Sequence, residues 1–218
     1  MKTFDELRLR RSRCRQEVLE LRDRLAAKRP LRELRDILPF LRDRPHLAAL
    51  CGVYNPTVFQ PNRITWEYDV FGDFACDLAV GDELTKSYTF IEFEDASPNS
   101  LFVRHGRKAT REWSPRFLRG FSQLVDWFCK LDDRRNSDEC EARFGKRSID
   151  SAGLLVVGRD GHLGAGERLR FEWWRENILV HSRRLPCVTY DELVANLLDY
   201  LGASAEAVPF RSGGVRGH

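Results

Sequence analysis

Three runs of alternating, branched and aromatic residues follow one another between residues 62 and 93, and they constrain the fold more than any other part of this 218-residue chain. The runs cover residues 64–71, 73–80 and 87–93. Gly72 and the pair Gly81 and Asp82 separate them as turns. Runs of this composition form strands, and short turns join strands that lie antiparallel. The sequence therefore predicts a three-stranded antiparallel meander.

Helical patterns surround this meander. Apolar residues recur near the helical period in residues 4–28 and again in residues 31–50, where Pro39 and Pro45 are expected to interrupt or bend the helix. In the later part of the chain, Ser114 and Pro115 predict the start of a helix, and residues 134–147 predict a surface loop. A buried strand is expected over 152–157 and a helix over 166–177. An edge strand over 185–189 and a helix over 190–201, which Gly202 stops, complete the prediction. This order predicts an α/β fold in which helices flank a central mixed sheet.

Composition favours one soluble globular domain with a helical extension, since 42% of the residues are hydrophobic and 32% are charged. No window is apolar enough to cross a bilayer, and the acids near the N-terminus are unlike a secretory signal. The six cysteines are scattered without a zinc-like spacing, which favours reduced thiols and a cytoplasmic location. Residues 1–45 carry 14 Lys or Arg against 8 Asp or Glu. The basic face of the helices there either contacts the phosphates of a nucleic acid or is an ordinary solvated surface.

Three acids in the predicted meander form the candidate site. Glu92 and Glu94 lie two residues apart in the third strand and should therefore point to the same face. Asp77 belongs to the neighbouring strand. Crowded carboxylates repel one another unless a proton or a cation relieves the repulsion, and hard cations prefer oxygen ligands. The pattern predicts a metal site formed by Asp77, Glu92 and Glu94, with Mg²⁺ as the simplest ion.

The same acids also have an ordinary structural interpretation. An antiparallel sheet often has one solvated face, so Glu92 and Glu94 could be surface residues. Asp69 and Asp73 compete with Asp77 for the place on the neighbouring strand, although they fit strand surface and turn better. From spacing alone, the metal site and the solvated face remain open alternatives.

Other polar residues are further candidates. Gln123, on the predicted helix after Pro115, could position water or phosphate through its amide, or could be an ordinary boundary residue. The loop after the acidic strand carries four basic residues, which could bind phosphates or could simply be solvated. These residues are Arg104, Arg107, Lys108 and Arg111.

The order of these elements resembles the core of the PD-(D/E)xK nuclease superfamily, and flanking landmarks resemble the C-terminal nuclease domain of Shedu antiphage defence proteins. The landmarks run in a consistent order from about residue 31 to 201: residues 40–47, Asp77 with Leu78, residues 90–94, Leu101 with Phe102, and residues 120–127, 154–159 and 188–193. The resemblance implies a restriction-endonuclease-like fold and three regions: an Arg-rich helical extension over 1–30, the nuclease domain over 31–202, and a flexible tail over 203–218.

The resemblance also implies roles for single residues in a metal-dependent DNA endonuclease. Asp77 would be the metal-binding Asp of the second strand and Glu92 the acid of the third, with Mg²⁺, or alternatively Mn²⁺, as the ion. Glu94 stands where the superfamily usually has Lys, so it would complete the metal coordination or act as base, while Gln123 would position water or phosphate. Glu33 is a candidate for an additional acid outside this core set.

Three interpretations of function remain open at this stage. The resemblance implies a DNA endonuclease that forms a homo-oligomer. The missing motif Lys makes a catalytically impaired nucleic-acid-binding or sensory module of the same fold the main alternative. A helical assembly protein that binds a partner through residues 1–30 is the third.

Overall fold

A six-stranded mixed sheet forms the centre of the protein, whose computed structural model describes residues 3–27, 29–180 and 183–206. The strands, in spatial order, are β1 (Asp5–Glu6), β2 (Arg63–Val70), β3 (Phe74–Asp82), β4 (Ser87–Phe93), β7 (Asp150–Val156) and β10 (Cys187–Val188). The first four strands are antiparallel, whereas β7 pairs parallel with both β4 and β10. The structure thus confirms the predicted meander and the mixed sheet.

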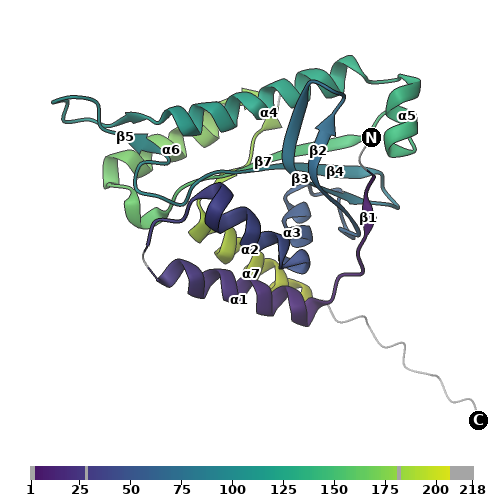
Figure 1. Ribbon diagram of the computed structural model, residues 1–218, viewed down its shortest axis with the longest axis horizontal. Coiled ribbons are helices and arrows are strands. Elements are labelled where there is room, and N and C mark those ends of the chain that lie inside the picture. The colour runs from purple at the N-terminus through teal and green to yellow at the C-terminus, as the bar shows by residue number, and fades with distance from the viewer. Residues whose placement is uncertain (1–2, 28, 181–182, 207–218) are drawn as a thin grey trace, which may run out of the picture.

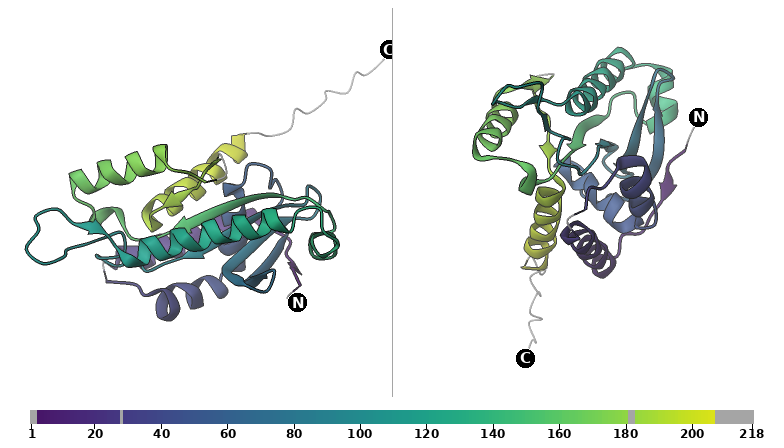
Figure 2. Two further views of the ribbon diagram at one scale, coloured as in Figure 1. Left: turned by 90° about the horizontal axis from the view of Figure 1, so that it is seen from above. Right: turned by 60° about the vertical axis from the view of Figure 1, so that its left-hand side comes forward.

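Helices cover both faces of the sheet, which confirms the α/β class (Figure 1). One face carries α1 (Arg11–Ala26), α2 (Leu38–Arg42), α3 (Pro45–Leu50) and α7 (Tyr190–Glu206). The other carries α4 (Pro115–Asp133), α5 (Asp138–Phe144) and α6 (Ala165–Asn177). Each layer encloses its own buried apolar cluster against the sheet. Figure 2 shows the long helix α4 running across the sheet from the second side.

Short elements complete the chain. They are the π-helix η1 (Glu33–Ile37), the 3₁₀ helices η2 (Cys51–Tyr54) and η3 (Asp160–His162), and two hairpins, β5 (Phe102–Val103) with β6 (Glu112–Trp113) and β8 (Leu179–Val180) with β9 (Arg183–Arg184). The predicted helical stretch over 31–50 is therefore confirmed but divided, with Pro39 and Pro45 in the first turns of α2 and α3. Within the described residues no helix combines the length and apolarity needed to cross a membrane.

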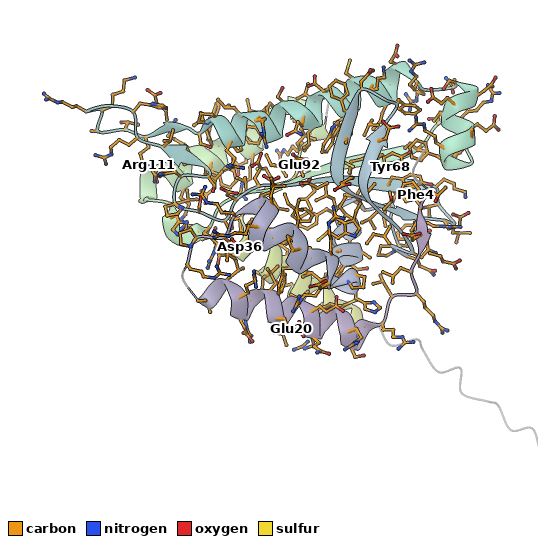
Figure 3. The ribbon with its side chains drawn as sticks, viewed as in Figure 1. Phe4, Glu20, Asp36, Tyr68, Glu92 and Arg111 are labelled. Atoms are coloured by element: carbon orange, nitrogen blue, oxygen red, sulfur yellow. The ribbon has the colours of Figure 1, made fainter. Side chains whose placement is uncertain are left out.

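The prediction of one helix over 4–28 is wrong at its beginning. Asp5 and Glu6 form β1 on the free edge of β2, and the N–H of Leu7 continues the contact by donating to the carbonyl of Asn62 at 2.8 Å. The Phe4 ring lies 5.1 Å from that of Tyr68 (Figure 3). An unpaired sheet edge and an aromatic cluster thus determine the conformation here, and α1 begins only at Arg11.

Residues 1–30 were predicted to form an Arg-rich helical extension of the domain. In the described part of this region, α1 packs against α3 and α7. Its inward residues belong to the same apolar cluster as one face of the sheet; they are Cys14, Val18, Leu21 and Leu25. The helix is therefore structurally continuous with the domain.

Two further predictions need correction. The segment 134–147 is not a loop throughout, because Ser137 caps α5 through its Oγ and buried Cys140 and Phe144 anchor the helix. Helix α7 does not stop at Gly202 but continues to Glu206, so the first residues of the predicted tail over 203–218 are helical. Residues 207–218 of that tail lie outside the described residues.

Candidate active site

In β2 and β3 the alternation of side chains between the two faces of the sheet is reversed at one point, and the candidate site lies at that point. Before Glu67 the even-numbered side chains of β2 join the cluster beneath α1, α2, α3 and α7, and after it they join the cluster beneath α4. Glu67 itself has φ of 50°, in the left-handed region that strand residues avoid. Leu78 and Cys76 show the same change of side on β3. Asp77 lies between them and is half-buried.

Asp77 is bound to the neighbouring strand at the place where the other two acids lie. Its Oδ2 accepts a hydrogen bond from the backbone N–H of Phe93 at 2.8 Å. Phe93 separates Glu92 from Glu94, which are only 4% and 0% exposed. Figure 3 shows Glu92 between α4 and α2. The structure therefore brings Asp77, Glu92 and Glu94 together, and the latter two are not on a solvated face.

Burial and the charges of neighbouring acids raise the pKa of all three carboxyls. Burial raises the pKa of Asp77, against the Phe93 N–H that lowers it, and the charge of Glu33 raises it further. The pKa of Glu92 is raised by burial and then by the charges of Asp77, Glu94 and Glu33. Burial raises the pKa of Glu94 to about 7, although a hydrogen bond from Arg116 opposes this. The four acids therefore form one electrostatically coupled cluster.

Glu33 belongs to this cluster, although it was only a weak candidate from the sequence. It begins η1 and is 8% exposed. Its segment is docked by an antiparallel bridge between Leu31 and Ala96, and its N–H donates to Asp95 Oδ1 at 2.7 Å. The segment before α2 thus presents an acid to the sheet.

Arg116, in the first turn of α4, supplies a cation to one side of the cluster. Its Nη1 lies 2.6 Å from Glu94 Oε2 and 3.1 Å from Glu33 Oε2. Its Nε lies 3.5 Å from Asp95 Oδ2, and Arg119 Nη2 lies 3.7 Å from Glu94 Oε1. Sequence reasoning missed both arginines. Their helical spacing with Gln123 could have revealed them, since residues three, four and seven apart share one face of a helix.

Gly120 allows α4 to approach Glu94. A Cβ at this position would lie 3.4 Å from Glu94 Cγ and Oε1 and 2.8 Å from Leu155 Cδ1. Gln123 is one turn further along the helix. Its Oε1 is buried and accepts no hydrogen bond from the residues that the structure describes, so an acceptor is available there. The structure does not, however, show Gln123 bonded to any of the three acids.

The donor chemistry of the cluster fits a hard divalent cation. The acids offer carboxylate oxygens, and the buried Oε1 of Glu94 has no hydrogen-bond partner among the described residues. Among residues 3–27, 29–180 and 183–206, no three His, Cys, Asp or Glu side chains are arranged so that they could already hold a metal ion. Asp77, Glu92 and Oε1 of Glu94 are the candidate ligands, and they do not form a closed cage.

The other polar candidates lie elsewhere. Asp69 Oδ1 accepts from the N–H of Gly72 at 2.6 Å, and Asp73 pairs with Lys130, so both acids have structural partners. Arg111 is held by Glu167 and by backbone carbonyls, including that of Pro98 at 2.7 Å. Lys108 pairs with Glu112 at 2.5 Å. Arg104 and Arg107 are exposed on the long loop between β5 and β6, which projects beyond the N-terminal end of α4 in Figure 1.

Fold and site together define an α/β protein with a mixed sheet and a buried carboxylate cluster beside arginines. The family model described as "Shedu protein SduA, C-terminal" matches residues 31–194, and the chain belongs to this family. Membership implies a role in antiphage defence. A comparison with curated proteins gave no match.

Proposed function

We propose that the protein is a Mg²⁺-dependent DNA endonuclease that acts in antiphage defence, in the cytoplasm, as a homo-oligomer. The observation that carries the proposal is the convergence of Asp77 on β3 with Glu92 and Glu94 at the end of β4, where burial and the charges of neighbouring acids raise the pKa of each. Such crowding is costly for folding, and a function that needs a cation accounts for it.

The architecture supports a restriction-endonuclease-like, PD-(D/E)xK core. An antiparallel meander leads through a long helix, α4, into β7, which pairs parallel with the last strand of the meander. The acids lie where β3 and β4 meet beneath that helix. This is the arrangement that the resemblance implied from the order of the elements.

The chain's own residues divide the work of phosphodiester hydrolysis. Asp77 and Glu92 would hold the ion, and Glu94 would add its Oε1. Gln123 Oε1 would accept a hydrogen bond from the attacking water and so orient it. When bound, Mg²⁺ polarises the phosphate and favours ionisation of the water. The water oxygen joins phosphorus, the ester P–O bond breaks, and the proton of the water ends on the released sugar hydroxyl.

DNA is the substrate class that the charge pattern favours. Arg104 and Arg107 are exposed on the loop between β5 and β6, and Arg119 is exposed on α4 close to the acids. Phosphate contacts from such residues position a duplex without reading its sequence.

One observation favours the alternative, a catalytically impaired nucleic-acid-binding or sensory module. Glu94 occupies the place of the motif Lys and is itself paired with Arg116, so the protein lacks the usual cation at that position. This module would bind DNA without hydrolysing it.

The two functions are separated by a plasmid assay with purified protein. The endonuclease should nick or linearise supercoiled DNA with Mg²⁺ or Mn²⁺ and should lose this activity on addition of EDTA. Asp77→Asn and Glu92→Gln should abolish cleavage, whereas Asp23→Asn, an exposed acid on α1, should not change it. Metal-independent DNA binding without cleavage would support the module instead. Sedimentation velocity on the same samples tests the homo-oligomer.

A further inference from the structure

The acidic cluster is divided into two parts that differ in their contact with cations. Glu94, Glu33 and Asp95 all lie within 3.5 Å of the Arg116 guanidinium. Asp77 and Glu92, in contrast, make no ion pair with any Lys or Arg among the residues that the structure describes. Within the described residues, Arg116 thus contacts one part of the cluster, while the other part, Asp77 with Glu92, is without an ion-paired cation.

Arg116 is held in one place by carboxylates from two separate segments of the chain. Glu33 comes from η1, while Glu94 and Asp95 follow β4. Both segments are fixed by backbone contacts, since Leu31 pairs with Ala96 and the N–H of Glu33 donates to Asp95. Carboxylates on several sides restrict the side chain more than a single surface ion pair would. The guanidinium is thus preorganised beside the candidate metal ligands.

Arg116 also has hydrogen-bond donors to spare. A guanidinium has five N–H donors, and here Nη1 serves Glu94 and Glu33 while Nε faces Asp95. Within the described residues Nη2 has no acceptor, and the side chain is 34% exposed. A phosphate oxygen entering from solvent could therefore reach two unused N–H groups of a cation that keeps its charge at any physiological pH.

We propose that Arg116 is a catalytic residue that takes over the role of the motif Lys, and that Glu94 is the residue that positions it. The inference rests on the proposed endonuclease function. Glu94 Oε2 holds the guanidinium in place, and Nη2 donates to an oxygen of the scissile phosphate and stabilises the charge that develops there. The positive charge that a Lys would supply at the position of Glu94 is thereby supplied from α4 by Arg116.

The competing explanation is that Arg116 only neutralises buried acids. Both explanations predict that Arg116→Met lowers the cleavage rate, so that variant alone does not decide between them. They differ for the double variant Glu33→Gln/Arg116→Met, which removes the Arg116 charge together with that of a carboxylate it contacts and leaves Glu94, a candidate metal ligand, in place. If neutralisation were the only role, the double variant would recover the cleavage rate of the wild type. If the guanidinium contacts phosphate, the cleavage rate of the double variant would remain low.

The experiment measures single-turnover cleavage of a DNA duplex at saturating Mg²⁺, together with Mn²⁺ affinity by electron paramagnetic resonance and thermal stability. Loss of a preorganised donor to a transition state typically costs about 10²- to 10³-fold in rate, so Arg116→Met should slow cleavage by about that factor. Mn²⁺ affinity should not fall, because Arg116 is not a ligand and its charge lies 2.6 Å from Glu94, a candidate ligand. Arg116→Lys should recover part of the rate, since it restores the charge without the planar fork.

A matched control is Arg147→Met, because Arg147 also contacts two carboxylates, those of Asp138 and Glu141, but on the surface near α5. Its cleavage rate should equal that of the wild type. The inference is overturned if the wild type cleaves and Arg116→Met cleaves equally fast, or if the double variant recovers the wild-type rate. A wild type that never cleaves refutes the proposed endonuclease function itself, and with it this role for Arg116.

Discussion

The backbone N–H of Phe93 donates to Asp77 Oδ2 at 2.8 Å, so the first acid of the cluster is bound to the peptide that separates the other two. This bond orients Asp77 and at the same time keeps Glu92 and Glu94 close to it. The repulsion among the three carboxylates is therefore maintained by the strands themselves. The arrangement lowers the stability of the fold, and the cost should be measurable.

Replacing Glu92 by Gln should make the metal-free protein more stable. Glu92 is 4% exposed, and burial together with the charges of Asp77, Glu94 and Glu33 raises its pKa. At neutral pH, above the ordinary pKa of Glu, the raised folded-state pKa destabilises the fold, and Gln does not ionise. The substitution should therefore raise the free energy of unfolding by at least about 1 kcal/mol, since one unit of pKa shift corresponds to roughly that energy. Urea denaturation in EDTA measures the change. Glu176→Gln on the exposed side of α6 should have no effect, and a less stable Glu92→Gln protein would contradict the repulsion.

Adding a methyl group at Gly120 should disturb the site. The new Cβ would lie 2.8 Å from Leu155 Cδ1 and 3.4 Å from the Glu94 side chain. Gly202, inside α7, has open space at the same position and is the matched control. Gly202→Ala should stabilise the protein by up to about 1 kcal/mol through helix propensity. Gly120→Ala should be less stable than that control by about 1–3 kcal/mol because of overpacking. Equal melting temperatures for the two variants would show that α4 does not press on Glu94.

The parts of the fold that could be predicted were those in which a local pattern and the tertiary structure agree. The meander was predicted because its runs are long, branched and separated by Gly72 and Gly81. Helix α4 was predicted because Ser114 caps it and Pro115 opens it. Strand β1 was not, because its two residues form a strand only where the edge of β2 is available. Helix α5 was missed because only two buried side chains anchor it.

The candidate site was predictable in its acids but not in its cations. Asp77 and Glu92 lie on strands, and Glu94 directly follows one, and the register of these strands follows from the alternation of the sequence. Arg116 approaches Glu94 only because Gly120 lets α4 pack closely, and Glu33 approaches because Leu31 bridges to Ala96. Such contacts depend on how distant segments pack, which a single sequence does not specify.

The stability of the protein should depend on pH through Asp82. Burial raises the pKa of this carboxyl, but N–H groups of Gln60, Leu84, Thr85 and Phe59 outweigh burial and lower it. A lowered pKa gives stability above the ordinary value near 4, and this stability is lost as the pH falls through the folded-state value. Asp82→Asn should therefore cost about 2–3 kcal/mol at pH 7, and the difference from the wild type should shrink below about pH 4.

Urea denaturation of the wild type and Asp82→Asn at several pH values measures this dependence. Asp43→Asn is the control, because that side chain is exposed on the segment after α2. A constant difference between wild type and Asp82→Asn across the acidic and neutral range would contradict the assigned hydrogen bonds.

Helix α1 should be essential for folding. Leu21 is 1% exposed in the cluster beneath the sheet, whereas Leu34 is 76% exposed. Leu21→Ala should lower the free energy of unfolding by about 2–5 kcal/mol, and Leu34→Ala should change it by less than about 0.5 kcal/mol. Calorimetry tests both. If deletion of residues 1–30 left a folded domain of unchanged stability, α1 would not be part of the folding unit.

The loop between β5 and β6 should contribute to the salt dependence of DNA binding. Arg104 and Arg107 are exposed there, and removing one arginine from a phosphate should reduce the slope of log K against log salt concentration by about 0.9. The double variant Arg104→Gln/Arg107→Gln should therefore have a slope lower by about 2. Arg13→Gln/Arg22→Gln, on the exposed side of α1, should leave it unchanged. Fluorescence anisotropy at several salt concentrations in Ca²⁺ gives the slopes, and equal slopes would remove the loop from the interface.

Residues 94–96 contact both the segment before α2 and the first residue of α7. Ala96 pairs with Leu31, near the start of the family match, while the hydroxyl of Tyr190, at the start of the last helix, donates to the carbonyl of Glu94 at 2.7 Å. The segment that carries the acid therefore has its full set of contacts only after α7 has been synthesised and has docked. A chain still emerging from the ribosome, or one cut short by a protease, would lack part of the support for its own site.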